Sequence, residues 1–296
     1  METSIWTYVV GVNRAALYGV MLLAAGSALF PLVMRLPPAI ADATARLRKF
    51  SALLAIAIYG LAVVFGGADM ITGGPLIVFK PEVWAMGFDS SLGRSAVIGI
   101  PGMVLLAWGF QTDNRLVLCG GIALGLLSFL VTGHAATAAP VWIMSAVVAM
   151  HLVCGAFWLG ALYPLYQATR LQSVPEAGEI MVAFSHRAAW VVASLVLSGV
   201  IISFVQVDRI DGLVSTTYGW RLLAKLGFFG FLIFLAAYNK MIVTPELATG
   251  QMQGALHMRR SIRLEYILFA FILAAAASLT ITAPPRNLSV GVKVGR

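Results

Sequence analysis

Long apolar runs, each of about 18 residues or more, recur along the whole chain. A helix of that length crosses the hydrocarbon core of a bilayer, which is roughly 30 Å thick. Continuous apolar runs form helices there because lipid offers no partners to unpaired backbone amides. The sequence therefore predicts an all-α, polytopic membrane protein with about eight transmembrane helices in one bundle. The expected spans are 15–34, 51–68, 94–110, 116–133, 141–163, 188–207, 221–242 and 264–283.

The composition also indicates a lipid environment. Hydrophobic residues make up 60% of the 296 residues and charged residues 11%, with a mean hydropathy of +0.91. A soluble domain of this size needs many more charges on its surface. The net charge of +8 comes mainly from short segments between apolar runs. We therefore expect membrane lipid as a partner and no nucleic acid.

The basic residues are distributed unequally between the two sides of the predicted bundle. Eleven lie in the connections after the first, third, fifth and seventh spans, and eight lie on the other side. Basic connections stay in the cytoplasm, so both termini are expected outside it. The eleven are Arg35, Arg46, Arg48, Lys49, Arg115, Arg170, Arg187, Lys240, Arg259, Arg260 and Arg263.

The remaining segments suggest one transmembrane domain over residues 1–296. No repeat of fixed period is visible. The N-terminus lacks the basic region and the cleavage site of a signal peptide, so the first span is expected to stay in the membrane. Segment 69–93 is broken by Gly and Pro and carries aromatic and charged residues, which predicts a surface-lying excursion.

Small residues in the apolar runs suggest close helix packing. Gly120, Gly121 and Gly125 fall in the fourth span, where they allow backbones to approach. Cys119 and Cys154 also lie inside apolar runs without CxxC spacing, which indicates neither a disulfide framework nor a zinc knuckle.

A histidine in the fifth span is the strongest candidate for chemistry, since a polar group at membrane depth is costly without a partner or a role. His151 shares nearly one helix face with Met144, Cys154 and Trp158. Imidazole, thioether and thiolate ligands suit Cu(I), whereas Mg, Ca or Mn would need oxygen ligands. Ordinary packing is the alternative for Met144 and Cys154. A hydrogen bond to a neighbouring helix is the alternative for His151.

Other polar residues lie at the edges of the spans. His134 sits in an uncharged outer loop and Asp69 at the outer end of the second span, so both are candidates for metal entry. His186 starts the sixth span on the inner side and is a candidate for metal exit. Lys225 and Glu265 lie near opposite faces and are expected to be structural, with Lys225 reaching outward, for example to Thr280 or Thr282. Glu265 is expected to meet an inner-side partner, which would be Arg263, Lys240 or Asn239.

An ordered set of short motifs resembles the bacterial copper resistance protein D (CopD) family nearly end to end, most strongly over residues 130–285. The central part is Gly133-His134-Ala135, then His151 and Trp158-Leu159-Gly160. The C-terminal part is Phe184-Ser185, Ser198-Gly199, Thr217-Tyr218-Gly219, Leu222, Lys225, Asn239, Thr244-Pro245, Arg260-Ser261, Arg263 with Glu265, and Pro284-Pro285.

This resemblance implies a copper-handling protein of the bacterial inner membrane, and not an enzyme. It implies Cu(I) or Cu(II) as the bound ion, often with a small periplasmic copper-binding protein as partner, and it carries over His134 and His151 as the histidines of the family. The expected path runs from His134 and Asp69 through His151, with Met144 or Cys154, toward His186. Two alternatives stay open, a membrane b-type haem protein that moves electrons and a factor that assembles a copper enzyme without transporting the ion.

Overall fold

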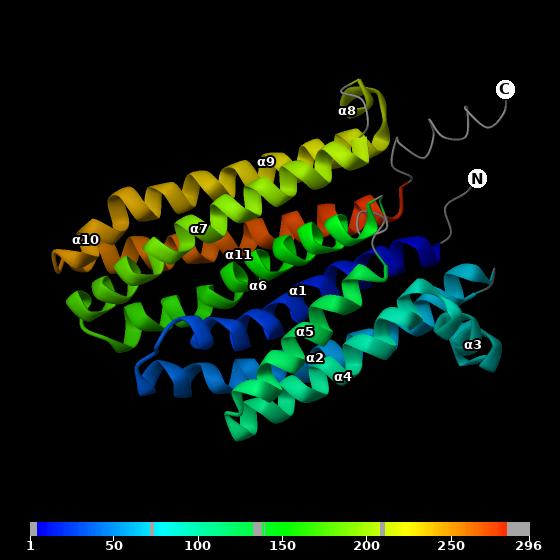
Figure 1. Ribbon diagram of the computed structural model, residues 1–296, viewed down its shortest axis with the longest axis horizontal. Helices are drawn as coiled ribbons and strands as arrows, with labels where there is room; N and C mark the ends of the chain where they lie inside the picture. The colour runs from blue at the N-terminus through cyan, green and yellow to red at the C-terminus, as the bar shows by residue number, and fades with distance from the viewer. Residues whose placement is uncertain (1–4, 72–73, 133–137, 139, 208–210, 283–296) are drawn as a thin grey trace.

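The computed structural model describes residues 5–71, 74–132, 138, 140–207 and 211–282, and helices are the only regular elements within them (Figure 1). The polytopic all-α fold expected from the sequence is confirmed. The elements are α1 (Ile5–Val33), α2 (Pro38–Met70), η1 (Pro75–Phe79), α3 (Pro81–Asp89), α4 (Ser91–Thr112), α5 (Arg115–Leu130), α6 (Val141–Leu171), α7 (Val174–Val207), α8 (Gly212–Ser215), α9 (Thr217–Tyr238), η2 (Asn239–Val243), α10 (Thr244–Ala248) and α11 (Met252–Thr280).

Seven helical segments of the described residues are long and apolar enough to cross a membrane, with α9, η2 and α10 counted as one continuous segment. The eighth expected span falls on α5, an apolar helix of 16 residues. At 1.5 Å per residue α5 is about 24 Å long, somewhat short of a full hydrocarbon core. The bundle therefore contains seven long helices and one short apolar helix.

Helices α1 and α6 lie between two groups of helices (Figure 1). Helices α2, α4 and α5 pack on one side, and α7, α9 and α11 on the other. The crossing of α1 and α6 has no room for a side chain, because a Cβ on Gly26 would lie 1.8 Å from the Ala156 carbonyl oxygen. A Cβ on Gly160 would lie 2.1 Å from the Gly26 carbonyl carbon. This backbone contact fixes the position of α6, which carries the candidate site.

Helices α4 and α5 form a tight antiparallel pair. Asn114 caps α5 by accepting hydrogen bonds from the Leu116 and Val117 amides, at 3.0 and 3.3 Å. A Cβ on Gly121 would lie 2.9 Å from the Gly102 carbonyl oxygen, so the close packing expected in the fourth span is confirmed there. Gly120 differs, since its added Cβ would make only an ordinary 3.8 Å contact.

Several helices extend well beyond the predicted spans, most of them at the end of the bundle that carries most of the basic residues, while α1 begins ten residues early at the other end. Helix α2 begins at Pro38 and α11 at Met252, so Arg46, Arg48 and Arg259 lie on helices rather than in the expected loops. The apolar-run criterion detects the lipid-embedded part alone, and Arg and Lys are good helix formers that do not end a helix. Figure 1 shows the first and last described residues together at the opposite end.

The described residues between α2 and α4 form two short helices, η1 and α3, neither of which is long enough to span a membrane. Helix α3 has nine residues and packs on α2, where a Cβ on Gly67 would lie 1.9 Å from the Val83 carbonyl oxygen. The indole Nε1 of Trp84 on α3 donates to the Val78 carbonyl on η1 at 2.9 Å, which joins the two short helices. The expectation that this segment does not cross the membrane is therefore confirmed.

Candidate functional site

The His151 imidazole lies partly buried on α6 against α7. Its Nδ1 is 3.2 Å from the hydroxyl oxygen of Ser198. Gly199 makes room for the ring, because a Cβ there would lie 3.3 Å from His151 Cε1. The Ser198-Gly199 pair therefore shapes one wall of the histidine site.

The hydrogen bonds of Ser198 determine which nitrogen of His151 is available. The Ser198 hydroxyl has a single proton, and it donates to the helix carbonyls of Ser194 at 2.7 Å and Leu195 at 3.1 Å. The Ser198 oxygen is then the acceptor, and His151 Nδ1–H is the donor. This tautomer leaves the lone pair on Nε2, which is the arrangement found in metal-binding histidines.

The other α6 candidates occupy different depths. Cys154 lies one turn from His151, is 5% exposed and belongs to the main hydrophobic core. Met144 is 3% exposed, but it lies seven residues before His151, about 10 Å along the helix. Met144 and His151 therefore belong to separate levels of the bundle. The structure does not place Met144 at the midplane with His151.

The candidate ligands at the edges of the spans are exposed where the structure describes them. Asp69 is exposed and accepts a hydrogen bond of 2.8 Å from the Thr7 hydroxyl, which ties α2 to α1. His186 is exposed on α7. His134 falls outside the described residues. In the described ranges, no group of three or more His, Cys, Asp or Glu side chains is close enough to hold a metal ion. The described candidate ligands therefore do not form one cage.

Lys225 lies on α9 and is close enough to His151 to interact with it electrostatically. The Thr280 hydroxyl donates to the Ala277 carbonyl and the Thr282 hydroxyl to the Ser278 and Leu279 carbonyls, so both oxygens can still accept, and the outward contact of Lys225 stays a prediction.

Glu265 forms a buried polar group that joins three helical elements. It is 4% exposed, and its carboxylate accepts from Asn239 Nδ2 at 2.8 Å and from Trp158 Nε1 at 2.9 Å. The contact with Asn239 confirms one of the partners expected from the sequence. Sequence reasoning missed Trp158, although a buried indole N–H needs an acceptor and Glu265 is the acidic residue of the eighth span.

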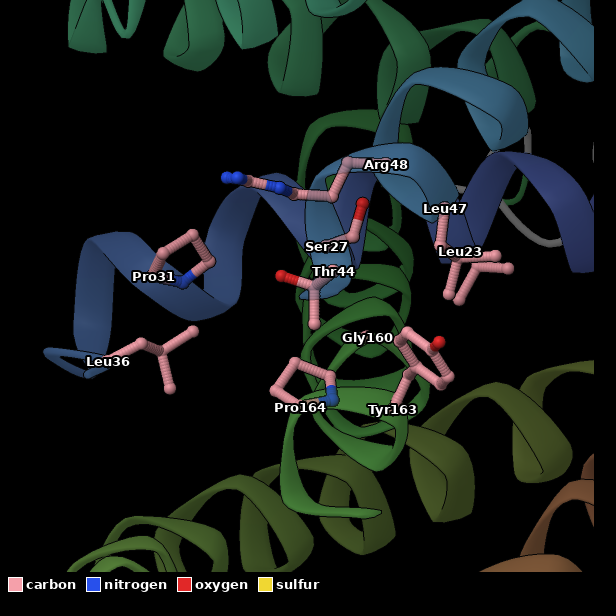
Figure 2. A pocket seen from close by; sticks show the side chains of 10 residues that line it. All are labelled: Leu23, Ser27, Pro31, Leu36, Thr44, Leu47, Arg48, Gly160, Tyr163 and Pro164. Atoms are coloured by element: carbon pink, nitrogen blue, oxygen red, sulfur yellow. The ribbon is translucent and has the colours of Figure 1, made fainter. Parts of the chain in front are cut away.

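Two of the cavities among the described helices bear on the site. The smaller, of about 10 Å³, is enclosed by α1, α2 and α6 and has room for about one water molecule (Figure 2). Arg48 lines it, with a buried Nε that has no partner. The larger cavity, of about 200 Å³, lies between α6, α7, the α9–α10 segment and α11, with Glu265 in its wall.

The fourth histidine, His257, contacts an acidic side chain. It lies on α11 near the basic end, and its Nδ1 is 3.1 Å from the Glu246 carboxylate. This contact joins α11 to α10.

The fold and these sites define a polytopic helical membrane protein with polar and soft-ligand side chains inside its bundle. Two family models match in chain order, "Copper resistance protein D-like, N-terminal domain" over residues 4–142 and "Copper resistance protein D" over residues 178–279. The chain belongs to the copper resistance protein D (CopD) family, as its motifs indicated.

Two curated relatives are similar over about half of this chain. "Copper resistance protein D" of Pseudomonas syringae pv. tomato is 32% identical over 182 residues, which cover 56% of this chain and 58% of that protein. "Copper transport protein CutJ" of Bacillus subtilis (strain 168) is 27% identical over 165 residues, covering 54% of this chain and 29% of that protein. The chain therefore spans less than two thirds of either relative. No solved structure matches it significantly.

Proposed function

We propose that this protein carries copper across, or takes it up at, the bacterial cytoplasmic membrane, without enzymatic chemistry. The family assignment supports the choice of metal, and the curated relatives are named for copper resistance and copper transport. The partner on the outer side is a small periplasmic copper-binding protein.

The single observation that carries this proposal is the orientation of His151. Its Nδ1 lies 3.2 Å from the Ser198 hydroxyl, and when the Ser198 proton is directed to the Ser194 carbonyl, Nδ1–H is the donor and the lone pair is on Nε2. Cys154 adds a sulfur one helical turn away. A nitrogen and a sulfur about one helical turn apart on the same helix form a soft ligand pair suited to Cu(I).

The partial burial of His151 favours the same ion, because each positive charge on a bound metal costs free energy in a low-dielectric environment. Cu(I) carries half the charge of Cu(II) and has the softer ligand preference. We therefore propose Cu(I) as the transported species at His151.

The proposed path uses the remaining candidates at other depths. Asp69, at the outer end of α2, and His134 capture the ion. Met144 lies about 10 Å above His151 and passes it inward. The ion leaves near His186, at the inner part of α7.

Copper binding to the purified protein tests this function. The wild-type chain is loaded with Cu(I) under anaerobic conditions, and the bound metal per folded molecule is measured. The His134→Ala, His151→Ala double variant is expected to lose bound copper, and the matched control His257→Ala to keep it. Unchanged metal content in the double variant would show that these histidines are structural, and a haem Soret band in the purified protein would favour the electron-transfer alternative.

A further inference from the structure

The larger cavity lies on the inner side of the His151 level, among four helical segments. Trp158 on α6 lies seven residues beyond His151, about 10 Å deeper along the helix. The cavity volume is about 200 Å³, enough for an ion with several ligands. Residues of α6, α7, the α9–α10 segment and α11 line it. The polar and sulfur-bearing ones include Trp158, Met181, Ser185, Asn239, Lys240, Thr244, Met258 and Glu265.

One acceptor in the cavity wall has no partner. Asn239 is 9% exposed, and its Nδ2 donates to Glu265, but its Oδ1 is buried without a hydrogen-bond partner. A buried amide oxygen without a donor is costly, and such groups occur where a ligand or ion completes the site. The carboxylate of Glu265 beside it adds negative charge. This end of the cavity therefore presents oxygen acceptors to a cation.

The backbone at Asn239 is also irregular. Residues Asn239–Val243 form a π-helical turn, in which the Thr244 amide donates to the Asn239 carbonyl five residues back. Such turns insert one extra residue into a helix and are frequent at functional sites. Both ends of this turn, Asn239 and Thr244, line the cavity.

Two thioethers line the inner end of the same cavity. Met181 on α7 is 2% exposed and Met258 on α11 is 4% exposed. Met258 lies seven residues before Glu265 and on the same face of α11, about 10 Å further toward the basic end. Thioether sulfur is a ligand that selects Cu(I) among biological metal ions.

We propose that this cavity is a second Cu(I) site on the inner half of the path, with the Met181 and Met258 thioethers as its ligands and the Glu265 carboxylate, hydrogen-bonded to Asn239, as the charge-balancing group above them. The inference rests on the proposed copper function and extends it. The three levels, at His151, at Glu265 and at the methionine pair, follow one another at intervals of about 10 Å. Glu265 balances the charge of the entering ion, and the methionines hold it next to the basic end of the bundle.

The test measures how many Cu(I) ions the full-length protein binds, by competition with a Cu(I) chelator. The Met181→Leu, Met258→Leu double variant is expected to lose one equivalent of Cu(I), because leucine keeps the volume and removes both sulfurs. Met103→Leu is the matched control, since Met103 is fully buried on α4 away from the cavity. Glu265→Gln is expected to weaken the same equivalent at least tenfold.

The outcomes separate the two proposals. If the His151→Ala variant loses one equivalent and the double methionine variant loses a different one, both sites stand. If the methionine variant and Glu265→Gln both bind copper like wild type, the cavity holds lipid or water instead, and the inner site is wrong while the His151 site remains. If the wild-type protein binds no copper, the proposed function and the inner site are both wrong.

Discussion

Gly160→Ala is expected to force α1 and α6 apart. The new Cβ would lie 2.1 Å from the Gly26 carbonyl carbon, whereas carbon atoms in contact are normally about 3.5 Å apart or more. The two helices must therefore separate by roughly 1.5 Å at their crossing, because the obstructing atoms are backbone and have no alternative rotamer. Overpacking of this kind costs about 1–3 kcal/mol, or roughly five- to 150-fold in the ratio of folded to unfolded protein.

Gly155→Ala on the same helix is the matched control. No heavy atom lies within 4 Å of the Cβ that this substitution adds. Alanine gains up to about 1 kcal/mol over glycine in helix propensity, so Gly155→Ala is expected to be neutral or stabilising. Gly160→Ala should thus lower stability, and Gly155→Ala should leave it unchanged or raise it.

The assay is unfolding of the purified variants in mixed detergent micelles, followed by tryptophan fluorescence. Gly160→Ala should unfold at clearly lower denaturant and Gly155→Ala at the same or higher denaturant. Equal stability of the two variants would refute the backbone contact of α1 with α6.

Further substitutions test other parts of the structure. Ser198→Ala removes the acceptor for His151 Nδ1–H, so copper affinity should fall by about 10- to 100-fold in a chelator competition, and an unchanged affinity would contradict the tautomer assigned here. Tyr59→Phe deletes a buried hydroxyl bonded at 2.6 Å to a serine on α5, and thermal unfolding should show a loss of about 0.6 kcal/mol, at most about 1.7. In a cysteine-free background, an impermeant maleimide should label Ser215→Cys in intact cells and spare Gln253→Cys. Labelling of the exposed position 253 alone would reverse the proposed orientation.

The sequence was sufficient to predict the spans and some of their packing. The apolar runs match the observed helices because hydrophobic length is set by the bilayer. Gly121 and Gly125 indicated close packing, and Glu265 was expected to find an inner-side partner such as Asn239. These features depend on residue type and on position along the chain, and both can be read directly from the sequence.

Other features depend on helix rotation and on neighbours far along the chain. The bond between His151 and Ser198 joins residues 47 positions apart, and the bond between Trp158 and Glu265 joins residues 107 positions apart. Which faces of two helices meet is decided by packing across the whole bundle, so spacing along one helix does not reveal it. The π-helical turn at Asn239 has no composition signal and was likewise missed.

Copper uptake into proteoliposomes tests the central claim most directly. Vesicles that contain the wild-type protein, His151→Ala or His257→Ala are supplied with Cu(I) outside, and the metal that accumulates inside is measured over time. The wild-type and His257→Ala proteins should accumulate copper at equal rates, well above protein-free vesicles, and His151→Ala should fall to the protein-free rate. Equal uptake by His151→Ala and wild type would contradict a copper path through the histidine on α6.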